Sequence, residues 1–321
     1  MNSRATCLTT ILFHRFFFDE EPVEKGRDRL KRQCEWLRKN YTPMSLPAAL
    51  KGLRVGQFPS RPLLITMDDA LIDILEVRDI FESFELPITI FVCVGWCENA
   101  SSRDSSQDSQ VARLVTMLEW YEGPDKDLEI DSGRVRVRLH RGQRDVTIDQ
   151  LLANQTELRP HLPHILAQLS EVTRRNSRRN VCTWDELIDL HATGTHIGCH
   201  SVSHVNLGAA SPTRMAFEII VARRILEAKF GECPVFAYPF GTPGSFTCLT
   251  AAELEKAGFQ FAFLTHSDFA DKNTDPFELP RIALPDRSIS YVEFCVRVAG
   301  AGVALRKIRQ SLRGCLTGCS I

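Results

Sequence analysis

Residues 63–69 read LLITMDD, and this stretch decides the fold of the chain. The apolar run 63–67 is typical of a β-strand that is buried on both faces. Two adjacent carboxylates, Asp68 and Asp69, stand where this strand ends. Neighbouring like charges that lose hydration need compensation by a metal ion, an arginine or a shared proton. A solvated turn or a helix N-cap is the plainer interpretation of an Asp-Asp pair.

A helix and a second strand follow the paired carboxylates. Apolar residues recur at helical spacing from Leu71 to Phe84, and Pro87 interrupts this pattern. The next apolar run, 88–94, predicts another buried strand. A strand, a helix and a strand in succession form a βαβ unit. Its first strand then places Asp68 and Asp69 at the C-terminal edge of a parallel sheet, where the active sites of α/β proteins collect.

Strands and helices alternate along most of the remaining chain. Further strands are predicted at 11–17, 195–199, 234–240, 259–264 and 279–283, and further helices at 26–40, 45–53, 183–191, 213–230, 250–257 and 291–312. Such alternation is typical of a (β/α) barrel or a doubly wound sheet. We therefore expect one α/β domain over residues 1–321.

The segment from about 98 to 180 has a different composition and is predicted to be an insertion in that domain. Residues 99–110 are rich in Ser, Asp and Gln, which favours a loop. Alternating apolar and basic residues up to His140 predict a β-hairpin at 128–140. A capping box of Thr147 and Gln150 then predicts the start of a helix. A second helix is expected at 161–175.

Composition excludes several classes of function. The net charge is −1, so no overall field favours nucleic acid as a partner. No apolar run reaches the length of a transmembrane helix, and the N-terminus lacks the features of a signal peptide. Eleven cysteines without an export signal indicate free thiols in a reducing compartment. We therefore predict a cytoplasmic protein.

His200 and His204 follow the predicted strand 195–199 and are four residues apart. In a helical turn this spacing places both imidazoles on one side. Two imidazoles and one carboxylate make a three-ligand site for a zinc-like ion, with a fourth position open for water. Two unrelated polar histidines are the plainer interpretation. The Asp68-Asp69 pair at another strand end favours the metal site.

Several motifs resemble those of one enzyme family. Residues 66–70, TMDDA, are similar to the TFDDG motif of the polysaccharide deacetylases, which are metal-dependent carbohydrate esterases. Residues 200–204 match that family's H[ST]xxH motif, and 236–241 are similar to its third motif. Residues 13–15 and 279–282 resemble the opening and closing strands of the bacterial exopolysaccharide branch. The motifs occur in the family's order between about 11 and 300, with 98–180 the least similar part.

The resemblance implies a distorted (β/α) barrel that removes an acetyl group from an N-acetylated sugar of a glycan. A divalent metal, in the simplest case Zn²⁺, would be held by Asp69, His200 and His204. Asp68 would remain unligated and would act as the general base.

The resemblance also implies the part of the site that meets the substrate. Tyr238, Pro239 and Phe240 of the third motif would contact it, and the backbone N–H of Phe240 would stabilise the tetrahedral oxyanion.

Three departures from the family pattern concern catalysis. Ala237 stands where the family has an arginine that orients the base; Arg281, from another strand, is the candidate replacement, with a solvated surface arginine as the alternative. Ala70 replaces a glycine, which costs on the order of 1 kcal/mol if this position requires a positive φ. No late hydrophobic-x-His motif supplies a general acid; His14 on the first strand is the candidate, with a core histidine as the alternative.

Two other functions remain open at this point: a glycan-binding protein that has lost turnover, and a metallo-amidohydrolase that acts on a non-sugar amide. A cytoplasmic location favours an intracellular substrate, such as a lipid-linked or nucleotide-linked glycan. The basic face of Arg134, Arg136 and Arg138 and the basic end of the last helix (about 291–313) are candidates to contact its phosphates or an anionic membrane surface. A solvated charged face is the plainer interpretation of both.

Overall fold

The computed structural model of the chain describes residues 7–18, 21–101, 106–121, 126–130, 135–139, 141–173 and 180–306. They form two compact units. The first lies within Met1–Asp68, Asp73–Thr89 and Phe263–Ile321, and the second within Asp69–Ile72 and Ile90–Ala262. Both units therefore combine segments that are far apart in the sequence, and the chain passes from one to the other between the two paired carboxylates. The prediction of one domain over 1–321 stays a prediction.

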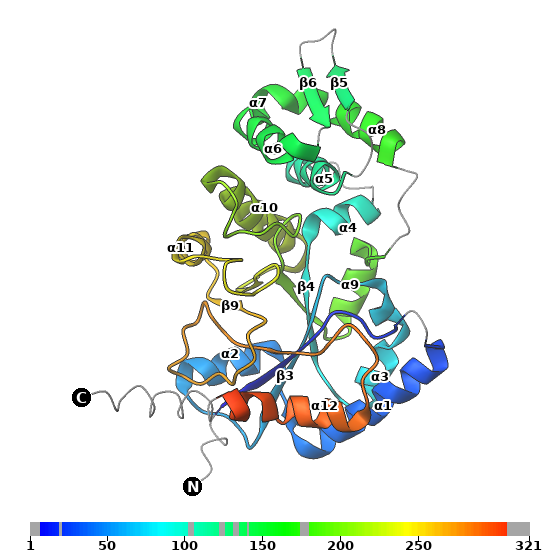
Figure 1. Cartoon of the computed structure of the whole chain (residues 1–321), viewed down its shortest axis with the longest axis vertical. Helices are drawn as coiled ribbons and strands as arrows, with labels where there is room; N and C mark the ends of the chain where they lie inside the picture. Colours follow the sequence, from blue (N-terminus) through cyan, green and yellow to red (C-terminus); the bar gives the residue numbers. More distant parts are fainter. Residues whose placement is uncertain are drawn as a thin grey trace, which may run out of the picture. The chain divides into compact units, whose positions relative to one another are not determined.

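The first unit is built around a small parallel sheet. In it, β1 (Thr9–Phe13) pairs with β3 (Pro62–Asp68), labelled in Figure 1, on one side and with β10 (Ile282–Ala283) on the other. The short strand β2 (Thr42–Pro43) also pairs with β3. Every residue of β1 and β3 is buried, which explains why the stretch before Asp68 is a continuous apolar run.

Helices pack around these strands. They are α1 (Val23–Asn40), α2 (Leu46–Val55), α3 (Arg78–Ser83) and α12 (Tyr291–Val298). The first helix packs against both α3 and α12. The helix predicted at 71–84 is wrong in its first half, because a 3₁₀ turn (η2, Ile72–Glu76) precedes α3. The helix predicted at 291–312 is interrupted after Val298 by a turn at 299–300. Residues 301–306 are helical again, and residues 307–321 lie outside the described part of the chain.

The second unit contains most of β4 (Ile88–Val92), then β7 (His196–Cys199), β8 (Val235–Ala237) and most of β9 (Phe261–Phe263). These strands lie in the order β4-β7-β8-β9, and β7 pairs with β8 in parallel. The helices of this unit include α4 (Val94–Ser101), α9 (Trp184–Ala192), α10 (Pro212–Phe230) and α11 (Cys248–Ala257). The backbone N–H of His200 donates to the carbonyl of Val92 at 2.9 Å, which brings the ends of β7 and β4 together.

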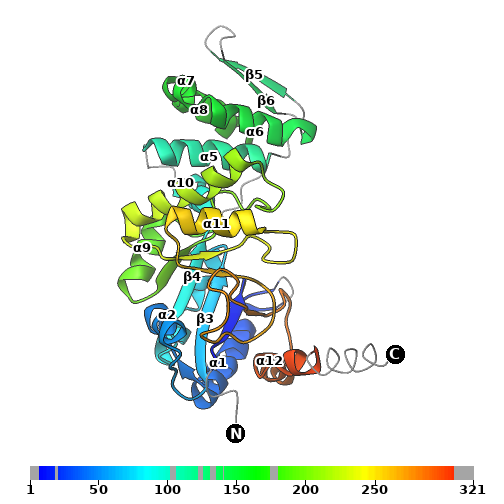
Figure 2. The same ribbon diagram turned by 90° about the vertical axis from the view of Figure 1, so that its left-hand side faces the viewer.

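The predicted insertion belongs to the second unit. It contains α5 (Gln107–Glu119), β5 (Lys126–Ile130), β6 (Val135–Leu139), α6 (Arg144–Ala153), α7 (Gln155–Leu158) and α8 (Leu162–Thr173). The two strands form the antiparallel hairpin predicted at 128–140. Both α5 and α6 pack against α10 (Figure 2). Buried apolar side chains of these helices therefore extend the core of the second unit.

Three start signals for helices were misassigned from the sequence. The loop predicted at 99–110 is wrong, since α4 continues to Ser101 and the hydroxyl of Ser106 accepts the Ser109 N–H to begin α5. Thr147 is not an N-cap, because it lies buried inside α6. The helix predicted at 250–257 begins earlier, at Cys248, with Thr247 as its cap. Serine and threonine occur at caps and inside helices alike, so their position alone does not fix a boundary. The helix predicted at 183–191 is confirmed, and Thr183 caps it through a capping box with Glu186.

Two predictions from composition can be compared with the described residues. The cysteines among them, nine in number, are all free thiols, as expected. None of the described helices is at once long enough and apolar enough to cross a membrane. The cytoplasmic location stays a prediction.

A buried carboxylate links η2 to the loop after β1 in the first unit. The Oδ2 atom of Asp73 accepts the backbone N–H groups of Phe16 at 2.5 Å and Phe17 at 3.4 Å. Its Oδ1 atom is buried and has no hydrogen-bond partner among the described residues. Burial raises the pKa of this carboxyl from its ordinary 3.8 to about 6, and the two backbone donors only partly offset that effect.

We expect Asp73→Asn to flatten the dependence of stability on pH. The folded chain binds the Asp73 proton more tightly than the unfolded chain, so the stabilisation is complete below pH 3.8 and is lost as the pH rises through about 6. Between pH 4 and pH 7 the native protein should lose roughly 1–3 kcal/mol that the variant retains. Urea unfolding at several pH values measures this difference.

Asp79→Asn is the matched control, because Arg27 lowers the pKa of Asp79 and shifts it in the opposite direction. The pH-dependent loss should persist in that control. An equal loss in Asp73→Asn and the native protein would contradict the assignment.

Candidate metal centre

The carboxylate of Asp69 is presented by a strained turn. Directly after β3, Asp69 has a φ of 70° and Ala70 a φ of 52°, both in the left-handed region. For Ala70 this conformation costs on the order of 1 kcal/mol, the strain expected if the position required a positive φ. The turn is held in place because the carbonyl of Ala70 accepts the N–H of Cys182 at 2.9 Å.

His200 is the first residue after β7, and its side chain is almost fully buried. Its Nδ1 lies 2.7 Å from the carbonyl oxygen of Ala237. A carbonyl can only accept, so Nδ1 must carry a proton, and in the neutral ring Nε2 then carries the lone pair. That Nε2 lies 3.6 Å from Oδ1 of Asp69. The backbone of β8 thus fixes the tautomer that is able to bind a metal.

His204 approaches the same carboxylate oxygen from another direction. Its Nε2 lies 3.7 Å from Oδ1 of Asp69. The ring stacks on Trp96, with centroids 5.4 Å apart, and meets the edge of Phe240 at 4.7 Å. The structure therefore brings together Asp69, His200 and His204, the three residues predicted as metal ligands.

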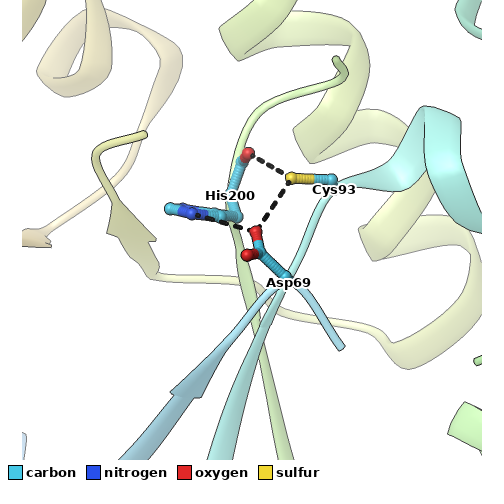
Figure 3. A group of neighbouring side chains, drawn as sticks. All are labelled: Asp69, Cys93 and His200. Atoms are coloured by element: carbon cyan, nitrogen blue, oxygen red, sulfur yellow. Dashed lines mark hydrogen bonds and ion pairs between the residues drawn. The ribbon is translucent and has the colours of Figure 1, made fainter. Parts of the chain in front are cut away.

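A thiol that the sequence analysis did not single out lies in the same place. The Sγ atom of Cys93 is 4.0 Å from Oδ1 of Asp69 and donates to the carbonyl of His200 at 3.2 Å (Figure 3). Asp69, Cys93 and His200 offer ligand atoms that all lie within 4.8 Å of one another. Burial, and then the charge of Asp69, raise the pKa of this thiol well above its usual value. In the sequence, Cys93 lies near the end of the predicted strand 88–94, and in the structure it directly follows β4.

This donor set fits a divalent transition metal. One carboxylate and two imidazoles are the ligands that catalytic zinc sites use, with a position left for water. The partner of Nδ1 on His200 meets the requirement that a ligating imidazole be oriented by a second hydrogen bond.

A buried ion pair supports the loop between the two histidines. The carboxylate of Glu218 on α10 is fully buried and accepts the N–H groups of Val202 at 2.8 Å and Ser203 at 2.9 Å. It also accepts the hydroxyl of Ser203 at 2.6 Å. Arg214 balances the charge by donating to Glu218 at 2.8 Å and to Glu119 at 3.1 Å. Glu218 thereby fixes the backbone between His200 and His204.

In the first unit, the other carboxylate of the pair has a partner of its own. The guanidinium of Arg281 donates to both oxygens of Asp68 at 2.7 Å, and both side chains are buried. The Nε atom of Arg281 donates to the carbonyl of Leu264 at 2.8 Å. Arg281 is therefore not a solvated surface arginine. Arg281 comes from a segment far from Asp68 in the sequence. It supplies the positive charge that the arginine of the family's third motif would supply, since this chain has Ala237 at that motif position.

His14, the predicted general acid, lies in the first unit and is not a core histidine. Its Nδ1 is 3.4 Å from Oδ1 of Asp286, and its side chain is 29 % exposed. The hydrogen bond from His14 is the main reason that the pKa of Asp286 lies below its usual value.

The three residues of the third motif differ in exposure. The side chain of Tyr238 is fully buried and stacks on Phe246 at 4.7 Å, and Pro239 is also buried. Phe240 is 51 % exposed and has a φ of 63°. Phe240 is thus the member of the motif whose side chain reaches solvent beside His204.

Part of the chain that contains two of the proposed metal ligands matches a known protein family. Residues 155–262, about a third of the chain, match the family model Polysaccharide deacetylase, and this segment contains His200 and His204. This segment of the chain is therefore similar to the polysaccharide deacetylases. No curated protein matches it in sequence. The family prediction made from the motifs is confirmed, including the segment around the two histidines.

Solved structures of polysaccharide deacetylases share the fold. The Streptococcus pyogenes deacetylase PplD in complex with acetate is 15 % identical, with a TM-score of 0.56 over 88 % of this chain and 93 % of that chain. IcaB from Ammonifex degensii is 14 % identical, with a TM-score of 0.56 over 92 % and 97 %. The deacetylase domain of BpsB from Bordetella bronchiseptica is 13 % identical, with a TM-score of 0.52 over 87 % and 96 %. The predicted α/β fold of the deacetylase barrel type is confirmed.

We expect Glu218→Ala to weaken zinc binding by roughly 10- to 100-fold, the usual effect of losing a group that orients metal ligands. Without Glu218 the loop between the histidines loses its buried acceptor. Competition with a chromophoric chelator measures the affinity, and circular dichroism checks the fold.

Glu227→Ala is the matched control on the same helix, since Glu227 forms an ordinary pair with Arg223 at 2.7 Å. Zinc affinity should be unchanged in that control. A folded Glu218→Ala protein with native zinc affinity would show that the loop needs no such support.

Proposed function

We propose that this protein is a metal-dependent N-deacetylase that hydrolyses the acetamide of an N-acetylated sugar, with Zn²⁺ as its metal. The observation that carries the proposal is the convergence of Asp69, His200 and His204, with the tautomer of His200 fixed for binding. These residues would hold the ion. A bound divalent ion supplies a Lewis acid for the amide carbonyl and an acidified water.

Asp68 is the proposed general base. Asp68 directly precedes Asp69 in the chain, so their Cα atoms are about 3.8 Å apart. The proposed base therefore stays next to the proposed metal ligand. Because Arg281 holds both of its oxygens, Asp68 keeps one orientation and its buried charge is balanced. One carboxylate for the ion and one for the proton is a division of labour suited to hydrolysis of an amide.

The remaining roles also come from the family resemblance. We assign the backbone N–H of Phe240 to the developing oxyanion and the region 238–240 to substrate contact. His14 is the proposed general acid that protonates the leaving amine, and its Nδ1 lies 3.4 Å from Oδ1 of Asp286. Arg281 is a positioning residue, since it acts through Asp68.

The substrate class follows from the family, and its finer identity is a hypothesis. An N-acetylated glycan that is linked to a lipid or a nucleotide would suit a cytoplasmic enzyme, with or without contact to an anionic membrane surface. Of the basic residues considered for the phosphates, Arg134 and residues 307–313 lie outside the described part of the chain. Arg306 donates instead to the carbonyl of Ser267 and to Asp268.

Asp68→Asn should reduce acetate release by roughly 10²- to 10⁴-fold, because it removes the base and leaves the three proposed ligands intact. Zinc content, measured on the same sample by atomic emission, should stay at the native level. The substrate panel should contain free, lipid-linked and nucleotide-linked N-acetylhexosamines together with a simple non-sugar acetamide.

Asp79→Asn, an exposed aspartate paired with Arg27, controls for the loss of a carboxylate in the same unit. Native-level turnover in a folded Asp68→Asn protein would exclude Asp68 as the base. A native protein that binds the sugars without releasing acetate would be a glycan-binding relative, and turnover of the non-sugar amide alone would identify a different amidohydrolase.

A further inference from the structure

We propose that Cys93 is a metal ligand, so that Asp69, Cys93 and His200 form a second ligand set beside Asp69, His200 and His204. The inference rests on the proposed metal-dependent function and goes further, because it assigns a sulfur atom to the site and thereby a preference among metals. The two sets share Asp69 and His200 and differ in the third ligand.

Distances among the donor atoms favour this assignment. Two ligands of one tetrahedral zinc ion lie roughly 3.3–3.8 Å apart, given bond lengths of about 2.0 Å to oxygen or nitrogen and 2.3 Å to sulfur. The Sγ of Cys93 is 4.0 Å from Oδ1 of Asp69, and Nε2 of His200 is 3.6 Å from the same oxygen. These two distances exceed the tetrahedral values by at most about half an ångström, and all three ligand atoms lie within 4.8 Å of one another.

Backbone hydrogen bonds hold Cys93 against the histidine loop. The N–H of Val94 donates to the carbonyl of Ser201 at 3.2 Å, and the N–H of Gly95 donates to that of Val202 at 2.9 Å. A Cβ atom at Gly95 would lie 2.8 Å from the carbonyl oxygen of Val202, so only glycine permits this approach. Moving Cys93 away from the site would therefore break these backbone hydrogen bonds between the start of α4 and the histidine loop.

The other buried thiols do not share this arrangement. Among the described residues, Cys93 is the cysteine found in a group of three potential metal ligands, as Figure 3 shows. Cys97 lies one helical turn further along α4 and is as buried as Cys93. Burial is also the main reason that the pKa of the Cys97 thiol is raised. Cys97 is therefore a matched reference for any effect that arises only from losing a buried thiol.

Ligation requires the loss of one proton. Without metal, the thiol donates its hydrogen to the carbonyl of His200. When the metal–sulfur bond forms, the S–H bond breaks and the proton passes to solvent, with no change in oxidation state. A thiolate favours zinc, cobalt and cadmium over magnesium and manganese, which prefer oxygen ligands. The site should accordingly select thiophilic ions.

X-ray absorption at the zinc edge tests the inference on the full-length, zinc-loaded protein. We expect one sulfur at about 2.3 Å in addition to nitrogen and oxygen at about 2.0–2.1 Å. The sulfur shell should disappear in Cys93→Ser and persist in Cys97→Ser. The cobalt-loaded native protein should also show a sulfur-to-cobalt charge-transfer band in the near ultraviolet, which Cys93→Ser should lose.

The spectrum of the native protein decides the question even if a variant does not fold. Zinc bound through nitrogen and oxygen alone would overturn the inference, as would a sulfur shell that survives in Cys93→Ser. Acetate release by a protein with no sulfur shell would leave the proposed function standing without Cys93. A sulfur shell in a protein that hydrolyses nothing on the substrate panel would leave Cys93 as a ligand and remove the function.

Discussion

Two adjacent carboxylates at the end of a buried strand impose the central constraint on this protein. Each negative charge loses hydration and each repels the other, so each needs its own compensation. Asp68 receives the bidentate guanidinium of Arg281. Asp69 turns away through a left-handed backbone conformation and meets the imidazoles of His200 and His204. The division of the chain into its two units falls between these same two residues.

The positions of these acidic and histidine residues were largely predictable, because the ends of buried strands can be recognised in a sequence. Apolar runs identify buried parallel strands, and the polar residues directly after them must share one edge of the sheet. That reasoning led to the Asp68-Asp69 pair and to His200 and His204, and the family resemblance then singled out Asp69 as the ligand. It failed for Cys93 because a cysteine at the end of an apolar run is usually a small core residue. The contact of Arg281 with Asp68 was proposed from family resemblance, since a single sequence does not record contacts between distant segments.

Local signals were less informative than the alternation of apolar residues. Ser106 begins a helix inside a stretch with the composition of a loop, and Thr147 lies within a helix that it was expected to cap. The helix at 213–230 was foreseen, but the role of Glu218 was not. A charged residue on an amphipathic helix is normally expected in solvent, and only the partners in the folded chain reveal that this one faces inward.

The orientation of His200 has a consequence for how this sequence can vary. Its Nδ1 proton is received by a main-chain oxygen of residue 237, and every amino acid supplies that oxygen. Replacing the side chain at position 237 therefore leaves the hydrogen bond that orients the imidazole of His200 in place. Alanine at this position therefore supplies the same acceptor as any other residue, and the other ring nitrogen still faces Asp69. The side chain at position 237 is thus free to vary, whereas its carbonyl oxygen must keep its place beside Nδ1 of His200.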